Sequence, residues 1–206
     1  MAARTISLVV CLLLLLGGLP VIRACTRVNT LTQYLINVAA PGTTFCFDPG
    51  VYSAYTTVKG GFKFHGPGFG KDPRPNAEGN PRDPYLAGKE AIFPSLTVRH
   101  NGFVLDGLTI QNSVTTVGPI SGLQIHNCFF HNAKIYSPTA AIKVSTSLFD
   151  SVSNGAVAIL DLGDSTDSSE VSNNYFRLGT FAMAVQVKHN TVVRDNMFVP
   201  SSPTQT

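Results

Sequence analysis

The sequence contains no tryptophan, and only 13% of its 206 residues are charged. Because 44% of the residues are hydrophobic, this low charge excludes a disordered chain and also a highly charged surface-binding protein. The chain instead contains 18 glycines, 13 prolines and 13 phenylalanines. That mixture favours short strands and many turns over long helices. The length suits a single domain with a sizeable core.

Long apolar stretches are absent beyond the N-terminus. Residues 1–24 have a basic start at Arg4, a mostly apolar run over residues 6–16, helix breakers over Gly17–Pro20 and a plausible cleavage site at Ala24. This layout is that of a secretory signal peptide, so we expect a secreted protein. The run is too short to span a membrane comfortably, and the mature chain offers no second one.

Clusters of basic residues are absent as well. The whole chain has 15 basic and 12 acidic residues, a formal net charge of +3. Arg4 and Arg23 belong to the predicted leader, so the mature chain keeps 13 basic and 12 acidic residues, a net charge of +1. No arginine-rich or lysine-rich run remains, which argues against a nucleic-acid partner.

Cysteines are few, and their spacing gives no zinc-binding pattern. Cys11 leaves with the leader. In an oxidising compartment Cys25 and Cys46 are the natural disulfide pair, and they would tie the N-terminal edge to the first coil. Acylation of Cys25 in a lipoprotein is the alternative, which Arg23 just before the cleavage site disfavours. For Cys128 we expect a buried thiol in preference to a reactive one.

A nine-residue pattern of two short apolar strands around a turn occurs five times, at residues 103–111, 123–131, 142–150, 169–177 and 191–199. Its third position is always aliphatic: Leu105, Ile125, Val144, Val171 and Val193. Its eighth position is aliphatic once and aromatic four times: Ile110, Phe130, Phe149, Phe176 and Phe198. Copies recur every 20 to 27 residues or so, which is typical of a stacked solenoid.

Each coil of that solenoid would carry three short parallel strands. The repeated pattern supplies two of them, and the third is expected in the stretches between copies, at Ser113–Val117, Lys134–Tyr136, Ala156–Leu162 and Ala182–Lys188. A helical interpretation of the copies fails because their apolar residues alternate and do not follow a 3.6-residue period.

The segment before the repeats begins with an expected helix over Asn29–Val38. One of its faces would be apolar, formed by Leu31, Tyr34, Leu35 and Val38, with Asn29 or Thr30 as the N-cap. An Ala-Pro-Gly break follows, then a strand over Thr43–Phe47, a Pro-Gly-Val-Tyr turn, and a further strand that ends near Gly66–Gly68.

This order resembles the opening of secreted right-handed parallel β-helix proteins of the pectin-lyase-like group, and the resemblance covers roughly residues 29–199. It implies an all-β right-handed parallel β-helix of about five or six coils, capped at its N-terminal end by the short helix. Asn174 and Asn196, at the sixth position of the pattern, resemble the internal asparagine ladder of that group. The expected organisation is one domain over residues 25–200 and a disordered tail over 201–206.

Residues 66–95 interrupt the pattern with a loop rich in proline and glycine. A loop of this length in a compact domain has two readings. It is either a solvated insertion folded along the barrel, which we favour, or a lid that grips substrate.

The resemblance implies recognition or processing of polysaccharide, by a pectate-lyase-like or glycoside-hydrolase-like enzyme. The lyases of the group use acidic residues to hold calcium and a basic residue to abstract a proton. Asp161, Asp164 and Asp167 would gather oxygen ligands for calcium, with Asp161 and Lys188 as the catalytic pair. The competing interpretation is that these aspartates are ordinary turn residues.

The sequence motifs of polygalacturonases, pectin esterases and the larger pectate lyases are missing. Sugar stacking would fall to Tyr136, Tyr175 or Phe181. His126 and His131 are expected at the surface, without a third metal ligand, and no nucleophile-elbow sequence supports a Ser-His-Asp triad. A non-catalytic module that binds glycans or another surface, or a structural module that assembles into oligomers through its exposed solenoid end, therefore remains the alternative.

Overall fold

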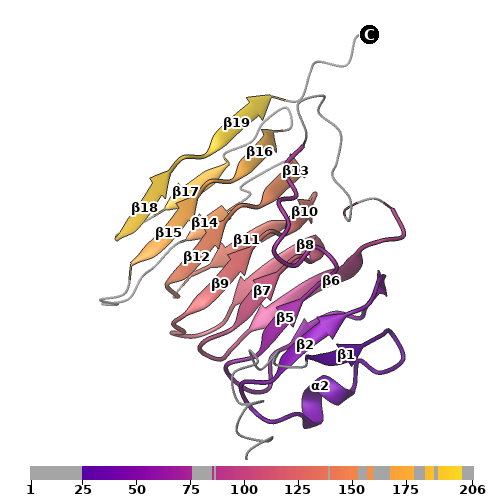
Figure 1. Ribbon diagram of the computed structural model, residues 1–206. Helices are drawn as coiled ribbons and strands as arrows, with labels where there is room; N and C mark the ends of the chain where they lie inside the picture. Colours follow the sequence, from indigo (N-terminus) through magenta and orange to yellow (C-terminus); the bar gives the residue numbers. More distant parts are fainter. Residues whose placement is uncertain are drawn as a thin grey trace, which may run out of the picture.

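The computed structural model describes residues 25–75, 85, 87–138, 140–152, 157–159, 168–178, 184–187 and 190–200. Over these residues the chain forms a parallel β-solenoid of about seven turns with almost no helix. The strand pairings are parallel from the first coil to the last. Figure 1 shows the coils stacked in sequence order, from β1 at one end to β18 and β19 at the other.

The first sheet contains one strand from every coil. Its eight strands pair in chain order: β1 (Thr26–Val28), β2 (Thr44–Phe47), β5 (Lys63–His65), β7 (Val104–Asp106), β9 (Leu123–His126), β12 (Ile142–Ser145), β15 (Ser169–Ser172) and β18 (Thr191–Arg194).

The other two faces of the solenoid are joined into one sheet of eleven strands, because two long strands run across both: β6 (Ala91–Val98) and β8 (Thr109–Thr116). The second face adds β3 (Gly50–Val51), β10 (Phe129–His131), β13 (Leu148–Val152), β16 (Tyr175–Leu178) and β19 (Met197–Pro200). The third face adds β4 (Tyr55–Thr56), β11 (Lys134–Ser137), β14 (Val157–Ile159) and β17 (Val185–Val187).

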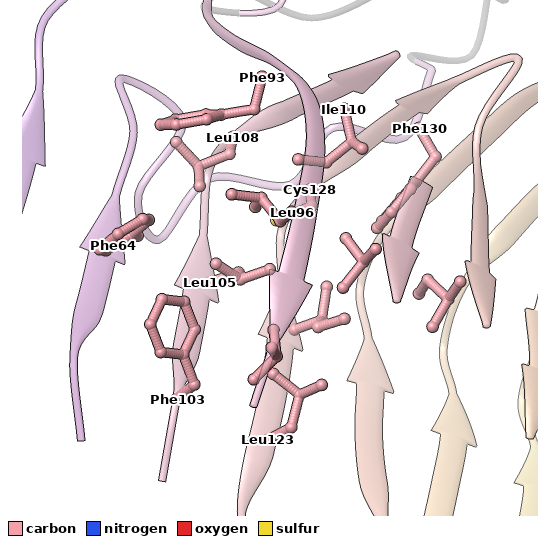
Figure 2. Close-up of a cluster of buried hydrophobic side chains, with 14 of the residues drawn as sticks. Phe64, Phe93, Leu96, Phe103, Leu105, Leu108, Ile110, Leu123, Cys128 and Phe130 are labelled. Atoms are coloured by element: carbon pink, nitrogen blue, oxygen red, sulfur yellow. The ribbon is translucent and has the colours of Figure 1, made fainter. Parts of the chain in front are cut away.

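The strand register confirms the repeat read from the sequence. Ile125 pairs with Leu105 on one side and with Val144 on the other, so the third positions stack coil on coil. The eighth positions do the same, and their phenyl rings lie nearly parallel. Ring centroids are 4.4 Å apart for Phe130 and Phe149 and 4.7 Å apart for Phe149 and Phe176. These buried columns fill the interior of the cylinder (Figure 2).

The solenoid is longer than the five or six coils expected. Phe45 and Phe64 stack in line with Leu105, and Phe93 stacks in line with Ile110. The core therefore extends upstream of the first copy. The repeat could not be recognised in these coils from the sequence, because a long insertion separates β5 from β6. That insertion also ends earlier than expected, since residues 91–95 belong to β6.

The turn inside each copy has a left-handed residue at the fifth position: Gly107, Asn127, Thr146, Asn173 and Asp195, with φ between 48° and 72°. Glycine, asparagine and aspartate tolerate this region best. The next position carries the predicted ladder, which is confirmed. Asn174 accepts a hydrogen bond from the Ser147 amide at 3.0 Å and donates to the Val144 carbonyl at 3.0 Å. The asparagine side chains of the ladder thereby provide hydrogen-bond acceptors for buried backbone amides of the turns.

The N-terminal helix was predicted at the right place but with the wrong length and the wrong buried face. It is α2 (Leu35–Val38), a single turn, and its buried side chain is Ile36. Leu31, Tyr34 and Val38 are mostly exposed, and Leu31 reaches 85%. Ile36 joins the core beneath the first coils, and this contact closes the N-terminal end of the solenoid (Figure 1).

The pairing of the cysteines agrees with the prediction. Cys25 and Cys46 form a disulfide, and Cys128 is a free thiol buried in the core. Burial raises the pKa of Cys128 to about 12, so the thiol stays protonated and unreactive. None of the helices in the described residues combines the length and the apolar character that a membrane span requires.

The described parts of the insertion, residues 66–75, 85 and 87–90, lie along the turns between the first and second sheets. The Gly70 amide donates to Asp106 Oδ1 at 3.1 Å, and Arg74 Nη1 donates to Asn173 Oδ1 at 2.7 Å. Tyr85 is buried and its hydroxyl donates to the Asn127 carbonyl. A Cβ atom at Gly66 would collide with the Gly107 backbone, which requires glycine there. These contacts favour an insertion folded along the barrel over a lid.

Candidate functional site

The residues predicted to carry chemistry fall outside the described part of the chain. These are Lys188 and Asp161, predicted as catalytic, and Asp164 and Asp167, predicted with Asp161 to bind calcium. Within the described residues, no group of three or more histidine, cysteine, aspartate or glutamate side chains could hold a metal ion. The aromatic candidates do not converge on one site: Tyr136 is exposed on the third face, Tyr175 lies on β16 of the second face, and Phe181 is outside the described residues.

The outer surface of the first sheet carries the most concentrated polar chemistry. On β9 and β12 the side chains at the second and fourth positions of the copies point away from the core, because those at the first and third positions are buried. Across β7, β9, β12, β15 and β18 the fourth positions form a row of paired residues: Asp106, His126, Ser145, Ser172 and Arg194.

Four of these outward residues form a two-by-two patch at the centre of the sheet. On β9 and β12, Gln124 pairs with Lys143 and His126 pairs with Ser145. His126 Nδ1 lies 2.7 Å from Ser145 Oγ, and His126 Nε2 lies 3.2 Å from Gln124 Oε1. We call these four residues the central patch.

The hydrogen bonds of the central patch fix the tautomer of His126. The Gln124 carbonyl oxygen can only accept a hydrogen bond, so Nε2 carries the proton and donates it. In the neutral ring Nδ1 is then free to accept, and the Ser145 hydroxyl donates to it. The arrangement is a hydroxyl, a base and a group that orients the base, in that order.

The electrostatic surroundings keep His126 neutral. Burial lowers the pKa of His126, an effect that the Asp106 carboxylate on β7 opposes and the Lys143 ammonium on β12 reinforces. Asp106 makes its own hydrogen bonds elsewhere, accepting from Asn127 Nδ2 at 2.9 Å and from the Gly70 amide. Gln124, not Asp106, therefore orients the imidazole.

A pocket of about 260 Å³ adjoins the central patch at the beginning of β9 and β12. Leu123 and Ala141 contribute a buried apolar floor, whereas Gln124 and Lys143 are exposed at the rim. The complete lining comprises Gly122, Leu123, Gln124, Ala141, Lys143 and Ser168. Ser168 directly follows Asp167 in the chain.

Towards the N-terminal end, the same face carries an exposed aromatic residue. The Phe69 ring stacks on the His65 ring with centroids 3.9 Å apart, and Phe69 is 51% exposed. His65 pairs with Asp106, which places this aromatic pair in the same row as the central patch. Burial lowers the pKa of His65 too, so the pair is neutral near neutral pH and offers an apolar platform.

A second polar cluster lies on the outer surface of the second face. Thr109 Oγ1 donates to Glu90 Oε1 at 2.6 Å, and burial raises the pKa of Glu90. Further along, Asp150 lies 3.4 Å from Arg177 and 3.9 Å from His131. Asp150 and Arg177 form an ion pair, and Glu90 is held by its hydrogen bond from Thr109. We regard this cluster as structural.

Sequence reasoning missed the pairing of His126 with Ser145. It placed His126 at the surface, which the structure confirms, but sought a metal and a classical serine motif. The signal was present in the repeat itself. Both residues occupy the fourth position of their copies, and stacking of the copies brings equal positions side by side.

Comparison of the chain with family models, with curated proteins and with solved structures finds no match. The function therefore has to be inferred from the residues on the surface of the solenoid.

Proposed function

We propose that this protein is a secreted, divergent relative of the pectin-lyase-like group that binds polysaccharide on the outer surface of its first sheet. The observation that carries the proposal is the pocket beside the central patch, where the Gln124 amide, the Lys143 ammonium group and the Ser168 hydroxyl surround an apolar floor. The asparagine ladder and the closed N-terminal end support the family relation. The Cys25–Cys46 disulfide supports an oxidising, extracellular location.

The chemistry of the pocket suits a sugar ring. Sugar hydroxyls donate and accept hydrogen bonds, and the Gln124 amide offers both kinds of partner. The Lys143 ammonium favours an acidic sugar, because it attracts the carboxylate of a uronic acid. Along the sheet, the exposed Phe69 ring provides a stacking surface for a neighbouring ring of the same chain. An extended polymer laid across the strands would contact all three residues.

Binding is tested by applying the purified mature protein to a glycan array that contains neutral and uronic-acid polymers. We expect retention of uronic-acid polymers, and a drop of about tenfold in affinity for Lys143→Ala, the size of one charge-assisted contact. Lys134→Ala is the matched control, because Lys134 is an exposed lysine on the third face. An array without any bound glycan, or equal losses in the two variants, would refute this site.

Processing of the bound polymer is the second part of the proposal, and it concerns Lys188 and Asp161. Incubation with uronic-acid polymers, with and without calcium, should release unsaturated ends detected by ultraviolet absorbance. The signal should disappear in Lys188→Ala and in Asp161→Ala. Activity that survives both substitutions would exclude the predicted lyase-like pair.

Assembly through the end of the solenoid is the competing function, favoured by one observation. In the outermost described coil, Val193 and Phe198 continue the core columns yet are 42% and 47% exposed. A second chain stacked on β18 and β19 would bury them and pair the strand edges. Light scattering should then give a mass that rises with concentration, and Phe198→Glu should restore the monomer. A constant monomer mass would contradict this function.

A further inference from the structure

The central patch contains the elements of a covalent hydrolase. Ser145 supplies a hydroxyl that donates to His126 Nδ1 at 2.7 Å, within the range expected for a nucleophile and its base. Gln124 Oε1 accepts a hydrogen bond from His126 Nε2, the other nitrogen of the ring. Lys143, two residues before Ser145 on the same face of β12, supplies a positive charge. Gln124 and Lys143, which stand two residues before His126 and Ser145 on their strands, line the pocket.

Other serines of the same face lack this environment. Ser172 occupies the paired position on β15, but it is only 6% exposed and bonds to the Glu170 carboxylate. Ser147 is fully buried, and its hydroxyl belongs to the ladder, where it accepts from the Cys128 amide and donates to the Ser145 carbonyl. Ser145 alone among these three is partly exposed and bonded to an imidazole.

We propose that Ser145 is the nucleophile of a carboxylic-ester hydrolase, with His126 as its general base and Gln124 as the residue that positions His126. The substrate class is an acyl ester on a hydroxyl group of the bound polysaccharide. That choice of substrate rests on the proposed glycan-binding function, whereas the Ser145–His126 chemistry does not.

The reaction proceeds in two balanced steps. Ser145 Oγ attacks the ester carbonyl carbon while its proton passes to His126 Nδ1, and the resulting oxyanion faces the Lys143 ammonium. The bond from carbon to the sugar oxygen then breaks, and the proton on Nδ1 moves to that oxygen, which leaves as a hydroxyl group. In the second step a water molecule, deprotonated by Nδ1, attacks the acyl-serine. The carboxylic acid departs, and Ser145 recovers its proton.

Gln124 acts through the orientation of His126. Its carbonyl oxygen accepts the Nε2 proton and so keeps Nδ1 unprotonated toward Ser145. A carboxylate at this position would accept the same hydrogen bond. Gln124→Glu should therefore retain hydrolysis, whereas Gln124→Ala should lower kcat about tenfold, since the ring loses its orientation. If Gln124 had only a structural role, differences in kcat would follow differences in stability. A lower kcat in Gln124→Ala than in Gln124→Glu at equal melting temperatures therefore supports the positioning role.

The experiment uses the full mature protein with a fluorophosphonate probe, p-nitrophenyl acetate, and an acetylated uronic-acid polymer. We expect the probe to modify Ser145, located by peptide mass spectrometry, and acetate to be released from both esters. Ser145→Ala and His126→Ala should each lower the rate of hydrolysis at least about 100-fold, the usual contribution of a general base. Ser172→Ala, at the paired position, should leave labelling and rate unchanged.

Two outcomes overturn the proposal: labelling that does not fall on Ser145, or hydrolysis that survives Ser145→Ala in a variant with wild-type circular dichroism. The result is separable from the glycan-binding function. Labelling of Ser145 and hydrolysis of p-nitrophenyl acetate without retention on the glycan array would support the nucleophile and reject polysaccharide as its substrate. Retention on the array without labelling of Ser145 would support binding and reject the hydrolase.

Discussion

Ser145 Oγ and His126 Nδ1 lie 2.7 Å apart although the two residues are 19 positions apart in the chain. One turn of the solenoid separates them, and the register of β9 and β12 places them directly opposite each other. The contact therefore depends on the register of the two strands. The spacing along the chain varies between coils, because Asp106 pairs with His126 across 20 residues and Ser145 pairs with Ser172 across 27.

The stability of the protein should fall as the pH is lowered through the titration range of histidine. Burial lowers the pKa of His126, which faces Asp106 on β7 and Lys143 on β12, and burial also lowers that of His65. Below the usual pKa of about 6.5, the unfolded chain binds protons that the folded chain does not, so the free energy of unfolding decreases. Urea denaturation at pH 7.5 and pH 5 measures this loss.

The His126→Gln variant should lose less stability than the wild type over that interval, because one of the two half-buried histidines is gone. His131→Gln changes an exposed histidine and serves as the control. Identical pH dependence in the wild type and in His126→Gln would show that His126 does not carry the effect.

Loss of a ladder side chain should destabilise the solenoid strongly. Asn174→Ala leaves the Ser147 amide and the Val144 carbonyl without their partners in the interior. Each buried unsatisfied group costs about 1–3 kcal/mol, so we expect a loss of about 2–4 kcal/mol in urea denaturation. Asn132→Gly, at an exposed left-handed turn residue, should change stability by less than about 1 kcal/mol. Equal effects of the two substitutions would contradict the role of the ladder.

Reduction of the disulfide should loosen the first coil. The Cys25–Cys46 bond closes a loop with a sequence separation of 21 residues, for which chain entropy predicts a contribution of about 3 kcal/mol. We expect the double variant Cys25→Ser/Cys46→Ser to melt at a lower temperature, and the wild type with dithiothreitol to match it. An unchanged melting temperature in the double variant would contradict this role of the disulfide.

Calcium binding by Asp161, Asp164 and Asp167 stays a prediction from the sequence. Titration calorimetry with calcium should give binding to the wild type and none to Asp164→Ala, because the loop would lose one of three oxygen donors. Asp195→Asn, at an exposed turn aspartate paired with Arg194, is the control and should bind like the wild type. Calcium binding that persists in Asp164→Ala would place the ion elsewhere.

The sequence predicted a longer N-terminal helix than the structure contains, and the reason is physical. Leu31, Tyr34 and Val38 occur at helical intervals, but a short helix at the end of a solenoid can bury only what fits against the first coil. Ile36 fits there, and the apolar residues around it remain exposed. The spacing of apolar residues along the chain does not show which of them will be buried in the core.

What the sequence determined by itself is the cross-section of the cylinder. Equivalent positions recur in each copy, and parallel strands stack them, so Ile125 and Phe130 could be assigned to the core from the pattern alone. The assignment of Asn174 to a ladder came from the family resemblance, and its hydrogen bonds confirm it. Only the tertiary structure decided which polar side chains touch. His126 and Ser145 share a position in the repeat, but whether they form a hydrogen bond depends on their rotamers and on the hydrogen bond between His126 and Gln124. The repeat specifies the backbone register, whereas the chemistry depends on side-chain geometry that no periodic pattern encodes.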